Sequence, residues 1–164
     1  MTAGIFALAG VLLGVLLEPA RARFASRARN RQERIERCGR LVEAAATALR
    51  LGASLNDVSR KTQRQGGRAP KEEQLQSIIT DYNLAYDRTG VAVALIRLSG
   101  PDELAEAADA VLMAIDAHHA KLQEPDDEAS RADPTALPDA LRRAREETRA
   151  AVDEFSSTAR RFTR

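Results

Sequence analysis

The chain of 164 residues has no tryptophan, only 4% aromatic residues and a single cysteine, Cys38. One cysteine cannot form an internal disulfide, so the sequence fits a reducing compartment, and Cys38 is expected to be a small buried residue. Strands favour aromatic and β-branched side chains, whereas alanine and leucine lead the apolar residues here and charged residues reach 30%. This composition is typical of long amphipathic helices, and we expect an all-α fold.

Charges of both signs are abundant, but they are unevenly distributed along the chain. Residues 1–68 contain 13 basic and 5 acidic side chains, a net charge of +8. Residues 71–164 contain 12 basic and 19 acidic side chains, a net charge of −7. Such an asymmetry indicates that the basic half meets a membrane or a nucleic acid, or that the two halves attract each other.

No charged side chain occurs from Thr2 to Leu17, and this segment has no polar face. As a helix it would be about 24 Å long, somewhat less than the ~30 Å hydrocarbon core of a bilayer. Local thinning of the bilayer and arginine side chains that reach the interface can close this gap. A secretory signal peptide, which would carry positive charge ahead of the apolar segment, and a helix buried in a soluble protein are the alternatives. We expect residues 1–20 to form a single transmembrane anchor.

Arginine occurs eight times between Arg21 and Arg40, directly after the apolar segment. By the positive-inside rule, this charge places the N-terminus outside the cell and the following domain in the cytoplasm. The arginines nearest the bilayer are expected to form a collar that binds anionic head groups. The collar residues are Arg21, Arg23, Arg27 and Arg29. Within the anchor, Gly10 and Gly14 form a GxxxG pair, a weak signal for close packing of two membrane helices.

The remaining residues predict an antiparallel bundle of about four helices. We expect an Arg-rich juxtamembrane helix over 21–55, a flexible polar linker over 56–70, and a bundle over 71–164 that part of the first helix completes. Apolar residues at alternating steps of three and four predict the packed face of the first helix. This face is expected to contain Ile35, Cys38, Val42, Ala45 and Leu49.

The helix after Pro70 is apolar on two sides. Its first face carries Leu75, Ile78, Ile79, Tyr82, Ala85, Tyr86, Val93 and Ile96. A second stripe carries Leu84, Val91, Leu95 and Leu98. A helix so broadly apolar is expected at the centre of the bundle, with both tyrosines in the core.

The segment SGPDE, from Ser99 to Glu103, predicts a tight turn between two helices. Glycine suits the end of the first helix and proline the first turn of the second. The heptad-spaced residues on the packed face of the third helix are expected to be Leu104, Ala108, Val111, Ile115, His118 and Leu122. Those of the last helix are Leu141, Ala144, Thr148, Ala151, Phe155, Thr158 and Phe162.

No segment of the sequence has the spacing of a known reactive site. His118 and His119 are adjacent, so on a helix they point about 100° apart and cannot easily chelate one ion. The acidic loop at 126–128 lacks the spacing of a calcium site, and the glycines at 66–67 lack the strand and the lysine of a phosphate loop. We expect no metal, no cofactor and no catalytic residue. A membrane-tethered enzyme with carboxylates facing one cavity is the least favoured alternative.

Three segments resemble small actinobacterial proteins of no agreed function that combine a hydrophobic N-terminal segment, an Arg-rich stretch and a helical domain. The segments are LLGVLLEPARARFASR, VALIRLSGPDELAEAADAVL and VDEFSSTARRF. This resemblance implies membrane attachment and an all-α fold, and it implies no activity.

These observations predict a membrane-anchored cytoplasmic helical scaffold or protein-interaction module. Self-association of the chain is one form that this interaction can take. Its expected partners are a bilayer with anionic head groups and a protein, which can be a second copy of the chain. A nucleic-acid-binding protein that uses the basic half is the alternative. It is less favoured because helix-turn-helix punctuation, zinc-ligand spacing and aromatic stacking residues are all missing from the sequence.

Overall fold

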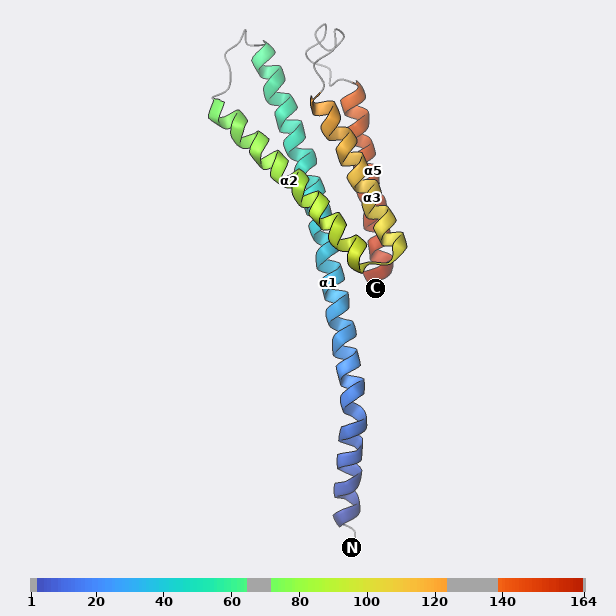
Figure 1. The fold of residues 1–164 in the computed structure, drawn as a ribbon. Coiled ribbons are helices and arrows are strands. Elements are labelled where there is room, and N and C mark those ends of the chain that lie inside the picture. Colours follow the sequence, from blue (N-terminus) through green and yellow to red (C-terminus); the bar gives the residue numbers. More distant parts are fainter. Residues whose placement is uncertain (1–2, 65–71, 124–138, 164) are drawn as a thin grey trace. The chain divides into compact units, whose positions relative to one another are not determined.

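The computed structural model describes the backbone of residues 3–64, 72–123 and 139–163, and the side chains of residues 25–58, 73–123 and 139–163. Within these ranges the fold is all-α (Figure 1). The helices are α1 (Ala3–Arg64), α2 (Glu72–Ser99), α3 (Asp102–Gln123) and α5 (Asp139–Thr163). The chain divides into two compact units, Met1–Glu36 and Arg37–Arg164. The second unit is a four-helix antiparallel bundle, as the sequence predicts.

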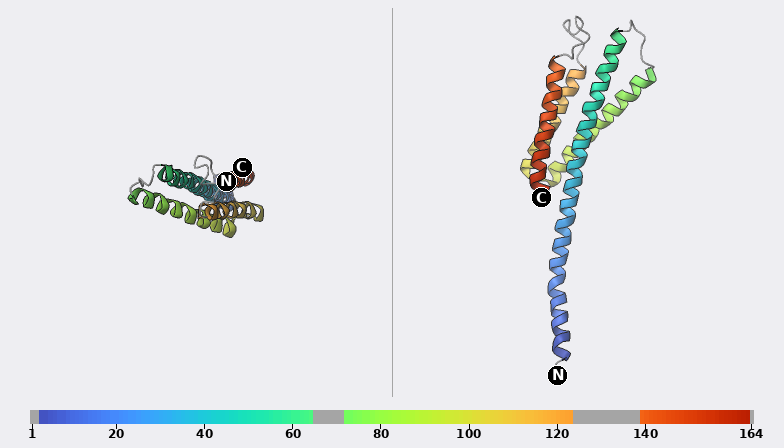
Figure 2. Two further views of the ribbon diagram at one scale, coloured as in Figure 1. Left: turned by 90° about the horizontal axis from the view of Figure 1, so that it is seen from above. Right: turned by 180° about the vertical axis from the view of Figure 1, so that it is seen from behind.

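Neighbouring helices of the bundle run in opposite directions (Figure 2). The turn between α2 and α3 lies beside the end of α5, where Arg161 forms an ion pair with Glu103 at 2.5 Å. Farther along α5, the Thr148 hydroxyl donates a hydrogen bond of 3.0 Å to the Ala114 carbonyl of α3. These two contacts hold α5 antiparallel to α3 along its length.

Side chains from all four helices form one core, and the largest of those that are fully buried is Phe155. The predicted positions on α3 are confirmed, because Leu104, Ala108, Val111, Ile115 and His118 are all buried. The predicted face of α5 is confirmed in the same way, since Leu141, Ala144, Thr148, Phe155 and Thr158 are buried. A heptad-like spacing is a strong signal here because the remaining faces of both helices are mostly polar residues and alanine.

The packed face of α1 was only partly predicted. Cys38 and Ala45 are buried as expected, but Ile35 is 40% exposed and Leu41 is fully buried. Leu49 is also buried as predicted, and Val42 is partly buried against the core. The buried residues that were not predicted are Leu41, Ala44 and Ala48. Apolar residues lie on both sides of the Cys38–Ala45 line, so the same sequence fits two overlapping seams. The observed face is turned toward Leu41, Ala44 and Ala48, which leaves Ile35 at the surface.

Helix α1 also continues to Arg64, past the predicted end near Leu55. The expectation of a linker from residue 56 was wrong for residues 56–64 because polarity was taken as a sign of irregular structure. Arginine, glutamine and lysine are good helix formers, and a polar segment without glycine or proline has no reason to leave the helix. The rest of the predicted linker, residues 65–70, lies outside the described residues.

The turn between α2 and α3 has the predicted form. The Gly100 amide donates a hydrogen bond of 2.7 Å to the Ile96 carbonyl, and the amides of Leu104 and Ala105 both donate to the Pro101 carbonyl at 3.0 Å. A side chain at position 100 would place its Cβ 2.8 Å from the Ile96 carbonyl oxygen, so only glycine fits without a shift of the backbone. Pro101 lies directly before α3, where its missing N–H costs no hydrogen bond, because the first amides of a helix have no partner within it.

Where side chains are described, no helix carries an apolar segment long enough to cross a bilayer. The predicted anchor at 1–20, with Gly10 and Gly14, lies outside that part of the chain. So does the acidic loop at 126–128.

Candidate functional site

The second apolar stripe of α2 is at the surface. Val91 is 61% exposed and Leu98 is 85% exposed, and Leu84 and Leu95 are also exposed. The expectation that both apolar faces of α2 pack in the bundle was therefore wrong. The reason is that one helix of a four-helix bundle contacts its neighbours through one face only. On α2 that face is already filled by its buried residues, which are Tyr82, Ala85, Thr89, Ala92, Val93 and Ile96.

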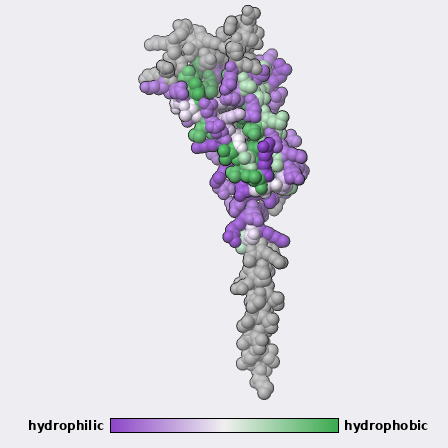
Figure 3. All heavy atoms as spheres, in the orientation of Figure 1, coloured by the Kyte–Doolittle hydropathy of each residue, from purple (hydrophilic) through white to green (hydrophobic). Residues whose placement is uncertain are grey.

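Beside this stripe lies a groove of about 530 Å³ between α1 and α2, within the bundle. Leu84, Val91 and Leu95 line one wall, and Ala44 and Thr47 of α1 line the other. The α2 wall extends over three turns of helix, a length of about 16 Å. Small residues on α1 facing large apolar residues on α2 leave space for inserted side chains. Figure 3 shows hydrophobic side chains at the surface over this part of α2.

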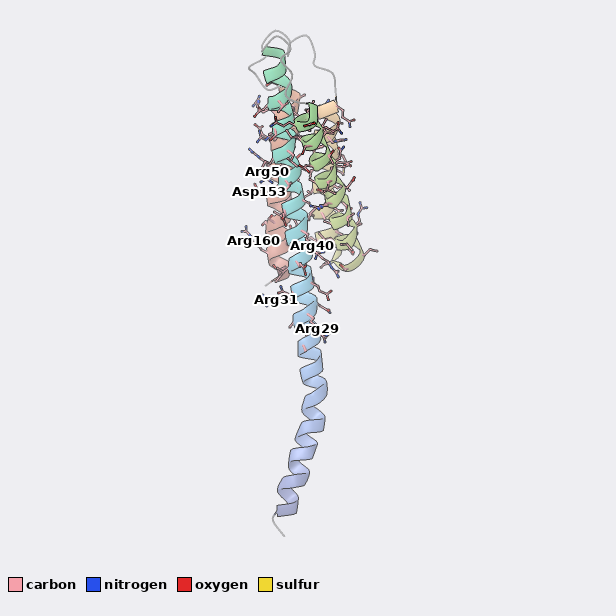
Figure 4. The ribbon with its side chains drawn as sticks, turned by 90° about the vertical axis from the view of Figure 1, so that its left-hand side faces the viewer. Arg29, Arg31, Arg40, Arg50, Asp153 and Arg160 are labelled. Atoms are coloured by element: carbon pink, nitrogen blue, oxygen red, sulfur yellow. The ribbon has the colours of Figure 1, made fainter. Side chains whose placement is uncertain are left out.

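The groove also has charged residues on both walls. Arg40 and Glu43 belong to α1, where Figure 4 labels Arg40, and Asp87 and Arg88 belong to α2. Two positive and two negative side chains make the rim electrically neutral overall. A neutral rim disfavours a strongly acidic ligand such as nucleic acid, and it suits a polypeptide that carries charges of both signs.

A cluster of aromatic and polar residues lies elsewhere in the bundle, where α2 meets α3. The ring of His119 stacks on Tyr82 and Tyr86, with ring centroids 5.5 and 4.7 Å apart. The Tyr86 hydroxyl donates a hydrogen bond of 2.7 Å to an oxygen of Asp116. This bond stabilises the neutral phenol, and with partial burial it raises the pKa of Tyr86. Tyr82 is buried, as expected for a core residue, and its burial raises its own pKa.

The contacts of this cluster indicate a structural role in packing α2 against α3. His119 is held by the Tyr82 hydroxyl at 3.2 Å and by the Gln123 amide at 2.8 Å. No group of three histidine, cysteine or carboxylate side chains that could hold a metal ion occurs among the described residues. Tyr82 and His119 therefore join α2 to α3 through ring stacking, which stabilises such pairs by about 0.5–1.5 kcal/mol.

His118 lies next to this cluster and is 3% exposed. Burial lowers its pKa to about 4, and the positive charge of Arg145 on α5 and the neighbouring His119 act in the same direction. The folded chain therefore keeps His118 neutral at pH 7. An ideal Cβ at Gly52 of α1 would lie 2.7 Å from the His118 ring, which shows that α1 and α3 are in close contact there.

Acidification is expected to destabilise the bundle through His118. A histidine in the unfolded chain titrates near pH 6.5, so below that pH the unfolded state binds a proton that the folded state excludes down to about pH 4. Stability is therefore lost as the pH falls through this window, by about 2 kcal/mol between pH 7 and pH 5. Urea unfolding at both pH values measures the loss. In His118→Leu this part of the pH dependence should disappear, and an unchanged pH dependence in the variant would contradict the assignment.

The residues predicted for the membrane site are only partly described. The side chains of Arg27 and Arg29 are exposed, and Figure 4 labels Arg29 on α1. The side chains of Arg21 and Arg23 lie outside the described residues, like the two anchor glycines. The groove itself was not predicted as a site. Its signal was present in the sequence as the second stripe of α2, which was taken for core.

Comparisons with protein-family models, with curated proteins and with solved structures find no match to this chain. The resemblance to small actinobacterial membrane-anchored proteins stays a prediction.

Proposed function

We propose that this chain is a membrane-anchored interaction module whose helical bundle lies in the cytoplasm and binds an amphipathic helix of a protein partner. The observation that carries this proposal is the exposed stripe of α2 beside the α1/α2 groove. Monomeric soluble domains rarely leave several large apolar side chains in one contiguous surface row, and such rows mark interaction sites. The bundle has its own core without this stripe, so the stripe is available for a partner.

The shape of the groove favours a helix as the bound element. An amphipathic helix binds in a hydrophobic groove through side chains at positions i, i+3 or i+4, and i+7. The α1/α2 groove offers apolar residues at the same spacing, with Leu84, Val91 and Leu95 along one wall. The charged rim would contact the polar flanks of the bound helix. In this mode of helix binding, the apolar contacts in the groove give affinity and the charges on the rim fix the orientation of the bound helix.

The carboxylates of the groove are better suited to ion pairing than to catalysis. Glu43 lies one turn from Arg40 on α1, Asp87 is followed directly by Arg88 on α2, and both acids are exposed. A catalytic site needs titratable groups that converge on one pocket with a positioned partner. Glu43 and Asp87 lie exposed on opposite walls of an open groove, which supports an interaction site over an enzyme.

Membrane attachment is supported by the apolar segment at 1–20 and by the collar that follows it. Each cation near an anionic surface adds about 1 kcal/mol of attraction. Arg27 and Arg29 are exposed, so their guanidinium groups are accessible to head groups. The same charges give the positive-inside signal for a cytoplasmic bundle.

Deletion of Met1–Pro19 tests the attachment. The truncated chain is expected to move from the membrane pellet to the soluble fraction, because no apolar segment of comparable length occurs elsewhere in the sequence. The full chain should stay in the pellet after a wash with high salt, which removes proteins held by charge alone. A truncated chain that still sediments in high salt would place the anchor elsewhere.

The collar is tested by its effect on orientation. Replacement of Arg21, Arg23, Arg27 and Arg29 by lysine should leave a C-terminal reporter in the cytoplasm, because the positive-inside effect depends on charge. Replacement of the same four by glutamine is expected to produce a mixed orientation. A reporter outside the cell in the unsubstituted chain would contradict the proposed topology.

A further inference from the structure

We propose that the helix that occupies the α1/α2 groove is α2 of a second copy of this chain, so that two copies form a symmetric dimer. This inference rests on the proposed use of the groove as a docking site, and it adds the identity of the bound helix. Each copy would then provide both the groove and the helix that enters the groove of the other.

The spacing of the stripe supports this occupant. The stripe follows alternating steps of four and three residues over about 21 Å of helix. Its positions are Leu84, Arg88, Val91, Leu95 and Leu98, of which only Arg88 is not apolar. This is the spacing of a coiled-coil seam, in which both helices carry the same apolar pattern. Of the large exposed hydrophobic residues in the described part of the chain, α1 and α3 contribute one each, Ile35 and Met113, and the others all belong to this stripe. The described element that best matches the groove is thus α2 itself.

The charges of the groove support the same occupant. An entering α2 brings Asp87 and Arg88 beside its apolar stripe, and the α1 wall that it meets carries Arg40 and Glu43. A negative and a positive side chain on the incoming helix therefore find charges of opposite sign on the receiving wall. A helix with charges of one sign only would be attracted by one of these two α1 residues and repelled by the other. Such repulsion disfavours binding of strongly basic or strongly acidic helices.

A two-fold arrangement also explains the exposure of Leu98. This residue lies beyond the groove lining and is 85% exposed. In an isologous interface the same surface of both copies is covered, so the whole stripe of each α2 is buried in one step. The interface closes on itself, and the association stops at two chains.

Photo-cross-linking of the full chain in its native membrane tests the dimer. Benzoylphenylalanine is placed at Val91, which is 61% exposed, or as a control at Met113 of α3, which is 73% exposed. Two copies with different tags are produced together. The probe at 91 is expected to give a product of twice 17.9 kDa that carries both tags, with the cross-linked peptide in α1 or α2. The probe at 113 should give at least about tenfold less of this product.

A second variant separates dimer formation from folding. Leu98→Glu adds a charge to the stripe at an exposed position that does not line the groove, so the helical content should be unchanged. The unfolding midpoint should also be unchanged when both chains are compared as monomers, at a dilution that dissociates the dimer. Cross-linking from position 91 should nevertheless fall about tenfold, because a charge buried in an interface is strongly unfavourable.

The outcomes distinguish the two proposals. Cross-linking from 91 only to other proteins would overturn the dimer and leave the groove as a docking site. Cross-linking from 91 no stronger than from 113 would overturn both. A doubly tagged product that survives Leu98→Glu unchanged would contradict the stripe as its interface.

Discussion

Replacement of Ile96 by alanine is expected to lower the free energy of unfolding by about 2–5 kcal/mol. Ile96 is 2% exposed and belongs to the core together with Val93 and Leu104. Its carbonyl also accepts the hydrogen bond of Gly100 that closes the end of α2, so its position is held from both sides. Removal of the side chain leaves a cavity that the surrounding helices can only partly fill. Chemical denaturation followed by circular dichroism measures the loss.

Leu98→Ala is the matched control, because it removes an apolar side chain of similar size two residues away on the same helix. Leu98 is 85% exposed, and its replacement should change the free energy of unfolding of the monomer by less than about 0.5 kcal/mol. Equal losses at the two positions would show that the buried and exposed faces of α2 are wrongly assigned.

Gly52→Ala is expected to destabilise the bundle, although alanine is the better helix former. An added Cβ would lie 2.7 Å from the His118 ring and 3.1 Å from the end of the Leu122 side chain. His118 is buried and cannot swing into solvent to make room. Overpacking of this kind costs about 1–3 kcal/mol.

Gly39→Ala on the same helix provides the comparison. An added Cβ at Gly39 meets no atom within 4 Å, and the position is exposed. This variant should gain about 0.5–1 kcal/mol, because alanine loses less backbone entropy in a helix. The two substitutions are chemically identical, so the difference in sign isolates the contact of α1 with α3. A stabilised Gly52→Ala would contradict that contact.

Much of the fold could be predicted because the helical signals of this sequence are strong and local. The Gly100–Pro101 turn and the spacing of Leu104, Ala108, Val111 and Ile115 predict α3 and its packed face directly. The face of α1 was harder, because apolar residues around Cys38 fit two seams and only the partner helices select between them. The end of α1 was missed because polarity does not by itself break a helix.

The site could be predicted less well than the fold. The sequence shows that α2 has two apolar faces, but it does not show which one the other helices cover. Tyr82, Val93 and Ile96 are buried because α1, α3 and α5 offer a continuous core on that side, and this depends on the tertiary arrangement. A stripe that is left over after the bundle is complete looks the same in sequence as a stripe in its core. The groove therefore becomes visible only when α1 and α2 are placed side by side.

The most direct test of the α1/α2 groove as a docking site is the reactivity of position 91 in native membranes. In the bundle alone, a cysteine at position 91 or at position 113 is exposed and should react with a maleimide at similar rates, while the unsubstituted chain reports the background from buried Cys38. If a helix occupies the groove, Val91→Cys should react at least about tenfold more slowly than Met113→Cys in native membranes, because burial in an interface excludes the reagent. This protection should disappear when the membranes are dissolved and the chain is diluted. Equal rates at the two positions in native membranes would contradict a docked helix.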